Sequence, residues 1–217
     1  MKWYRYLWIS ILIFCGFLLE YLVILMESML LGFNLSSYTP VQRSVHHILM
    51  AVIWSVLAGA LLIYSDRLFQ FPRSCEYRKR SRRNWITAIL CLAGCKVITF
   101  LDWHTLKVIG EFQGKALLSF GTQYLYYFAE VGLVLLILMF GQKAAESFLN
   151  RESSVPFGGI LLAITWGAFH FVSRGMGFEL WNGISCMIFS VLAGMMYLQL
   201  KRKPSISYVF LAIGYLL

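Results

Sequence analysis

Charged residues are scarce in this chain. Asp, Glu, Lys and Arg make up 13% of its 217 residues, whereas hydrophobic residues make up 59%. A soluble globular domain carries about twice that charged fraction, and the mean hydropathy of +0.70 lies well outside the soluble range. The composition therefore excludes a soluble protein and predicts a chain built for a lipid bilayer.

The apolar stretches also lack the alternation that a transmembrane β-barrel would show. The run from Val131 to Phe140 is instead apolar on every face, which is typical of a membrane helix. A helix needs about 20 apolar residues to cross the bilayer core. Seven stretches qualify in whole or in part: 6–27, 47–65, 86–101, 117–140, 157–176, 180–200 and 205–217. We therefore expect an all-α fold, a polytopic transmembrane helical bundle of about seven spans, as a single integral membrane domain over residues 1–217.

A cleavable signal peptide is not expected, because the first apolar run is too long and no small-x-small cleavage site follows it. Basic residues are distributed unevenly between the loops. If the N-terminus is cytoplasmic, 14 of the 19 Lys and Arg residues fall in cytoplasmic segments, 4 fall in outer segments, and Lys96 lies inside the third stretch. This asymmetry is what membrane insertion normally produces. We expect an integral protein of a bacterial plasma membrane with a cytoplasmic N-terminus.

Half of the cytoplasmic basic residues lie in one loop at about 66–84. The run from Arg73 to Arg83 is expected to contact anionic lipid rather than RNA or an acidic partner. Membrane lipid is thus an expected partner, and nucleic acid is not.

The fourth stretch carries polar residues along one side. Gln123, Tyr127 and Glu130 are spaced i, i+4 and i+7, which places them on one helix face. Glu130 lies about 20 Å from the start of the stretch, near its middle. An ionisable group at that depth is costly unless it is paired or faces water. Gln142 and Glu146 lie one turn apart nearer the cytoplasmic end.

The fifth stretch carries the second ionisable group at membrane depth. It contains Trp166-Gly-Ala-Phe-His170, and Arg174 shares the face of His170. Asn182 follows early in the sixth stretch. Because a short connection joins the fourth and fifth stretches, we expect antiparallel neighbours, with Glu130 and His170 turned into the bundle.

These two residues allow two interpretations. In the first, the carboxylate takes a proton from water while the imidazole positions that water or stabilises developing negative charge. In the second, Glu130 and His170 hydrogen-bond each other, or Arg174 or Tyr127, and fasten helices together.

Further polar residues lie toward the outer side. Arg43 to His47 is expected to form an interfacial turn, and its adjacent histidines point to different helix faces, so they are a poor chelating pair. Glu20 and Lys96 lie at membrane depth, where they form a structural pair or serve transport or proton relay. Neither an internal repeat nor a broken-helix pair supports a transporter.

Around Glu130, Glu146 and His170 the chain resembles the CAAX-protease and bacteriocin-processing family of multi-helix membrane proteins. Its first motif is a paired glutamate followed by an arginine, its second an aromatic residue four before a histidine, and its third a later histidine four before Asn or Asp. Trp166 and His170 fit the second motif, with tryptophan in place of phenylalanine. The resemblance covers residues 117–217.

The other two motifs depart from the family pattern. Glu130 has neither a second glutamate nor the arginine, whereas Glu146 has Arg151 at the family spacing but Ser147 in place of the second glutamate. No histidine follows His170, and Tyr208 and Ala212 stand where the third motif would fall. Its loss places metal binding and catalysis in question.

The resemblance implies an intramembrane endopeptidase that hydrolyses a peptide or membrane-protein substrate. Glu130 or Glu146 would act with His170, and Glu130 is favoured because it lies at mid-membrane. The cofactor is left open, because the resemblance implies glutamate and histidines around either an activated water or a divalent metal such as zinc. The alternative is a non-catalytic relative that binds peptide or another membrane protein in immunity or secretion. The supporting residues would be Gln123, Tyr127, Gln142, Arg151, Trp166, Arg174 and Asn182.

Overall fold

The computed structural model describes the chain apart from residues 1, 34–36, 70–80 and 174–176. The fold is 84% helical, and the described residues contain no strand, so the expected all-α class is confirmed. Five helices are long and apolar enough to cross a membrane. The chain is therefore an integral membrane protein.

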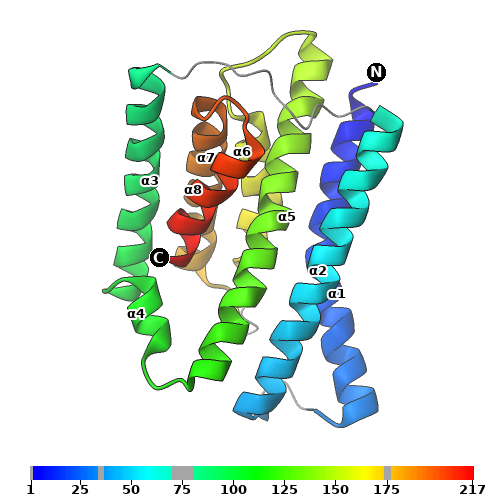
Figure 1. Cartoon of the computed structure of the whole chain (residues 1–217), viewed down its shortest axis with the longest axis vertical. Helices are drawn as coiled ribbons and strands as arrows, with labels where there is room; N and C mark the ends of the chain where they lie inside the picture. Colours follow the sequence, from blue (N-terminus) through cyan, green and yellow to red (C-terminus); the bar gives the residue numbers. More distant parts are fainter. Residues whose placement is uncertain (1, 34–36, 70–80, 174–176) are drawn as a thin grey trace.

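The N-terminal part of the chain forms a helical hairpin. α1 (Tyr4–Leu31) ends at Gly32, whose φ of 66° gives the left-handed cap that glycine adopts without strain. α2 (Pro40–Phe69) begins with a proline, which the first turn of a helix tolerates, and it returns beside α1 (Figure 1). The expected interfacial turn at 43–47 is wrong, because α2 already includes these residues and His46 is buried.

The middle of the chain supplies two more long helices. α3 (Arg82–Trp103) starts at a capping box, in which Ser81 and Asn84 satisfy each other's backbone N–H groups. The short helix α4 (Lys107–Phe112) follows, and α5 (Leu117–Leu149) then runs the whole height of the molecule. Most of the expected basic loop at 66–84 falls on residues 70–80, outside the described residues.

α5 is the central helix of the fold. It packs against α1 and α2 on one side and against α6 and α8 on the other, while α3 packs on α7 and α8. From Val131 to Phe140 every residue except Gly132 is buried, as an apolar run without a polar face requires. The large exposed apolar side chains of α1 and α2 form a surface suited to lipid.

One helical segment of the C-terminal part is shorter than the span that was expected at 157–176. α6 (Phe157–Leu162) continues into the π-helical turn η2 (Ala163–Gly167), and together they are about 17 Å long. α7 (Leu180–Gln199) is long enough to span, and α8 (Pro204–Leu216) matches the expected stretch at 205–217 to within one residue at each end. The segment formed by α6 and η2 therefore falls short of a hydrocarbon core of about 30 Å.

α6 descends antiparallel beside α5, which confirms the expected contact between these neighbours (Figure 1). Gly159 of α6 and Gly194 of α7 make a very close approach, since a Cβ on Gly194 would lie 2.6 Å from the Gly159 Cα. Small residues allow membrane helices to pack this tightly. This contact holds η2 in place beside α7.

Candidate functional site

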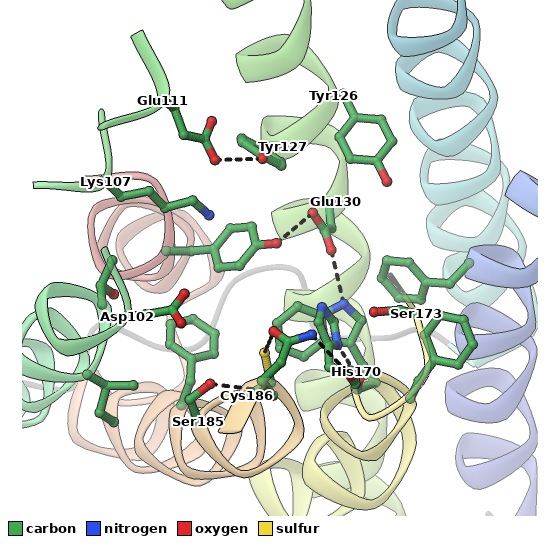
Figure 2. Close-up of a pocket in the computed structure, with 18 of the residues that line it drawn as sticks. Asp102, Lys107, Glu111, Tyr126, Tyr127, Glu130, His170, Ser173, Ser185 and Cys186 are labelled. Atoms are coloured by element: carbon green, nitrogen blue, oxygen red, sulfur yellow. Dashed lines mark hydrogen bonds between the residues drawn. The ribbon is translucent and has the colours of Figure 1, made fainter. Parts of the chain in front are cut away.

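A cavity of about 480 Å³ lies between the two sides of the bundle. Every element except α6 contributes to its wall. The carboxylate, ammonium and imidazole side chains that line it are Glu20, Asp102, Lys107, Glu111, Glu130 and His170. Figure 2 shows how the labelled polar groups, including Glu130, Lys107 and Asp102, converge on this space. Polar groups at membrane depth are thereby gathered around a cavity rather than turned toward lipid, as their solvation energy requires.

Glu130 is held in place by two neutral donors. Its Oε1 accepts a hydrogen bond of 3.1 Å from the Trp166 indole N–H, and its Oε2 accepts one of 3.0 Å from the Tyr215 hydroxyl. The side chain is 5% exposed, so the expectation that Glu130 faces the bundle with polar partners is confirmed. These bonds also connect α5 with the inner ends of η2 and α8.

His170 is oriented from the end of η2. Its Nδ1 lies 2.7 Å from the backbone carbonyl of Trp166, and its ring contacts the Trp166 ring edge-on at 4.3 Å between centroids. Since a carbonyl oxygen only accepts, Nδ1 carries the proton, and in the neutral ring Nε2 is then the acceptor. Asn182 of α7 donates to the His170 carbonyl at 2.8 Å. A π-helical turn, a feature that often occurs at functional sites, thus sets the direction of the ring.

A second polar cluster lies on the α4 side of the cavity. The Lys107 ammonium sits over the Tyr215 and Tyr127 rings, 4.0 and 4.5 Å from their centroids. The two oxygens of Glu111 accept from the Tyr127 hydroxyl at 2.8 Å and from Gln123 Nε2 at 2.7 Å. The expected polar stripe of α5 therefore has a partner in α4, and cation–π contacts hold the lysine at the cavity wall.

Glu146 lies at a separate site, about 24 Å along α5 from Glu130. Its Oε1 accepts from Arg202 at 2.6 Å and from Gln142 at 2.9 Å. Gln142 also accepts from the Gly158 backbone N–H at 3.1 Å. The expected partner of Glu146, Arg151, has an exposed side chain at the rim of a second cavity of about 350 Å³.

The structure therefore brings Glu130, Trp166, His170 and Asn182 together and separates Glu146 from them. Helix register alone had left open which glutamate reaches His170; Glu130 lines the same cavity as His170, whereas Glu146 lines the second cavity. The expected supporting residue Arg174 lies outside the described residues. The pairing of Glu20 with Lys96 is wrong, since Glu20 bonds to Tyr126 and His46 whereas Lys96 donates to the Ile213 carbonyl.

The described residues do not offer a metal site. Among them, no three His, Cys, Asp or Glu side chains stand close enough together to hold an ion. At the cavity wall, the oxygens of Glu130 accept from an indole and a phenol. The zinc that the resemblance implies therefore does not fit the donor set of this part of the chain.

Sequence reasoning missed three residues of the site: Lys107, Glu111 and Tyr215. Lys107 was counted as an outer loop residue, although Lys107 and Glu111 are spaced one helical turn apart. Tyr215 gave no signal, because a tyrosine in an apolar helix is common. The segment where the third family motif would fall does reach the site, through Tyr215 rather than through Tyr208 or Ala212.

Comparison with family models, with curated proteins and with solved structures found no match for this chain.

Proposed function

We propose that this chain is an intramembrane hydrolase that cleaves a peptide bond of a peptide or membrane-protein substrate inside the cavity. The observation that carries the proposal is that Glu130 and His170 line one cavity among membrane helices and are both positioned by Trp166. A carboxylate and an imidazole that are fixed at the wall of one cavity have the chemistry that water activation needs.

Glu130 serves as the base in this proposal. A carboxylate has about four acceptor positions, so hydrogen bonds from Trp166 and Tyr215 orient Glu130 and leave it able to accept one from water. Water adds to the carbonyl carbon of the substrate while its proton passes to Glu130. The C–N bond then breaks, and the proton moves to the leaving amine.

His170 and Lys107 supply polar support at the same cavity. With Nδ1 bonded to a carbonyl, His170 uses Nε2 to accept a hydrogen bond from the attacking water. The Lys107 ammonium stabilises the negative charge that develops on the substrate oxygen, an effect that is strong where water is excluded. An apolar substrate segment suits the aromatic wall formed by Trp54, Phe169 and Phe189.

We place this activity in a bacterial plasma membrane with the N-terminus in the cytoplasm. The support is the excess of basic residues in the segments that α1, α2, α5 and α7 present at one end of the bundle. In that orientation, the ion pair of Glu146 and Arg202 lies at the cytoplasmic side.

Turnover by the purified protein in lipid nanodiscs tests the proposal. A library of quenched fluorescent peptides with apolar segments is incubated with the wild type and with Glu130→Gln, His170→Gln and Glu146→Gln variants. We expect cleavage by the wild type and Glu146→Gln, and loss of cleavage in the other two, because glutamine cannot take a proton near neutral pH. Thermal unfolding of each variant confirms that it is folded. Cleavage by folded Glu130→Gln at the wild-type rate would contradict the proposal.

A non-catalytic binding protein is the second candidate. It is favoured by the hydrogen bonds of Glu130, which fasten α5 to η2 and α8, and by the poor fit of the described residues to a metal. Such a protein would bind a peptide from the library in the cavity without cleaving it. Saturable binding that Glu130→Gln weakens, together with no turnover by the wild type, would select this candidate.

A further inference from the structure

A continuous line of hydrogen-bonding groups joins the cavity to the connection between α1 and α2. The Tyr126 hydroxyl donates to Glu20 Oε2 at 2.9 Å, and Glu20 Oε1 lies 3.4 Å from His46 Nε2. On its other side, His46 Nδ1 lies 2.8 Å from Glu27 Oε2, which also accepts from the Tyr38 hydroxyl at 2.6 Å. Neither the site chemistry above nor the packing of the core uses these groups.

The line is buried in its middle and open at the cavity. His46 is 5% exposed and Glu27 is 3% exposed, whereas the side chain of Glu20 is 30% exposed because it lines the cavity. Glu20 and Glu27 are seven residues apart on α1, which corresponds to about 10 Å along the helix. His46 of α2 bridges that gap.

Two features indicate that these hydrogen-bonded groups do more than hold α1 against α2. Each ring nitrogen of His46 meets a different carboxylate, so a proton received at one nitrogen can leave from the other. In addition, Glu27 Oε1 is buried without a hydrogen-bond partner, although such an atom normally has one. Chains of Asp, Glu and His at membrane depth are the usual form of a proton path.

We propose that Glu27, His46 and Glu20 form a proton relay between the α1–α2 connection and the cavity. Protonated Glu27 gives its proton to His46 Nδ1 while Nε2 gives its proton to Glu20, so the total charge of the three groups does not change. One passage of a proton leaves neutral His46 protonated at Nδ1 and unprotonated at Nε2. The relay operates whether the cavity cleaves its ligand or only binds it.

Other polar groups surround the relay and set its electrostatics. Tyr126 of α5 and Tyr38 of the connection donate to its carboxylates. On α2 itself, Arg43 and His47 lie nearest, and the His47 ring is 6.2 Å from the His46 ring between centroids. His47 also contacts the Tyr126 ring at 5.3 Å, but it is not part of the hydrogen-bonded line. It is therefore a matched control for His46.

The experiment follows proton arrival at Glu20 after a rapid pH jump, with the complete protein in nanodiscs. Time-resolved infrared spectroscopy records the carbonyl band of the protonated carboxyl group, which is assigned to Glu20 by its loss in Glu20→Gln. We expect a fast rise in the wild type and in His47→Gln, and a rise at least tenfold slower in His46→Gln. The amplitude at equilibrium should change little, because the relay affects the rate rather than the final state.

Equal rates in His46→Gln and His47→Gln would overturn the proposal, since Glu20 would then receive protons directly from water in the cavity. If His46→Gln does not fold, Glu27→Gln replaces it, because that change removes the entry group and retains the histidine. A wild-type rate in folded Glu27→Gln would overturn the proposal equally, and a tenfold slower rate would support it.

Discussion

At the scale of single residues, Trp166 joins the two polar groups of the proposed site. Its side chain is 1% exposed, its indole N–H donates to Glu130, and its carbonyl accepts from His170. One residue therefore fixes both polar groups of the proposed site. The sequence shows why: a spacing of four residues puts Trp166 and His170 on adjacent turns.

Replacing the Trp166 indole N–H should separate its effect on the orientation of Glu130 from the effect of the ring on packing. Trp166→Phe keeps an aromatic ring but removes the N–H group that holds Glu130 Oε1. We expect turnover, or ligand affinity if the protein only binds, to fall between about 10-fold and 100-fold. The free energy of unfolding should fall by about 1 kcal/mol.

Ser10→Ala is the control for this change. Ser10 is also buried and also loses one hydrogen bond, which it donates to the Ile137 carbonyl at 3.1 Å, but it does not line the cavity. We expect a similar change in melting temperature in detergent and a much smaller change in turnover or affinity. Equal functional losses in the two variants would show that the Trp166–Glu130 bond has no special role.

The candidate site could be predicted from the sequence only in part. Glu130 and His170 were identifiable because ionisable residues are rare in apolar stretches. Lys107 and Tyr215 were not, since α4 and α8 have no fixed register relative to α5 before the chain folds. The pairing of Glu146 with Arg202 also depends on a turn in which Lys201 and Arg202 both adopt positive φ. Local pattern does not reveal such a turn, because non-glycine residues seldom adopt that conformation.

At the scale of elements, helix existence followed from the apolar runs, whereas helix length did not. Each of the seven expected stretches contains a helix in the described part of the chain, but α6 with η2 ends before the apolar stretch at 157–176 does. Phe169, which follows η2, lines the cavity instead of extending a span. High hydropathy predicts that a residue is removed from water, but it does not indicate whether lipid or protein surrounds that residue.

The glycine contact between α6 and α7 gives a test at this scale. In Gly194→Ala, the new methyl group would meet the Gly159 backbone, so the two helices must move apart. We expect the free energy of unfolding to fall by about 1–3 kcal/mol, measured by thermal or denaturant unfolding in detergent. Gly132→Ala on α5 is the control, because nothing lies within 4 Å of its added Cβ. That variant should change stability by less than about 1 kcal/mol, and a comparable loss in both would refute the close-packing explanation.

At the scale of the whole molecule, the helices alternate in direction, so that the described helix ends that flank the basic segments lie at one end. Figure 1 shows the start of α3 and the end of α5 at one end of the bundle, and the connection between α4 and α5 at the other. The described fold is therefore compatible with the charge asymmetry of the sequence, because the segments assigned to one side of the membrane lie at one end.

Cysteine labelling of intact cells tests this orientation. Arg82→Cys at the start of α3 and Gln113→Cys in the connection after α4 introduce thiols at exposed positions on opposite ends. A membrane-impermeant maleimide should label Gln113→Cys in intact cells and Arg82→Cys only after the membrane is permeabilised. Labelling of Arg82→Cys in intact cells would place the start of α3 outside the cell and contradict the cytoplasmic N-terminus.

The short reach of α6 and η2 has a consequence for the bilayer itself. Ile160 and Ile164 on this segment are exposed, so it presents part of its surface to the surroundings of the bundle. A helical segment of about 17 Å beside a hydrocarbon layer of about 30 Å creates a hydrophobic mismatch, which lipids relieve by local thinning. A thinner bilayer next to the cavity shortens the apolar distance that a hydrated polar group has to cross. We therefore expect membrane thickness, adjusted through lipid chain length, to control how easily the proposed substrate enters from the lipid phase.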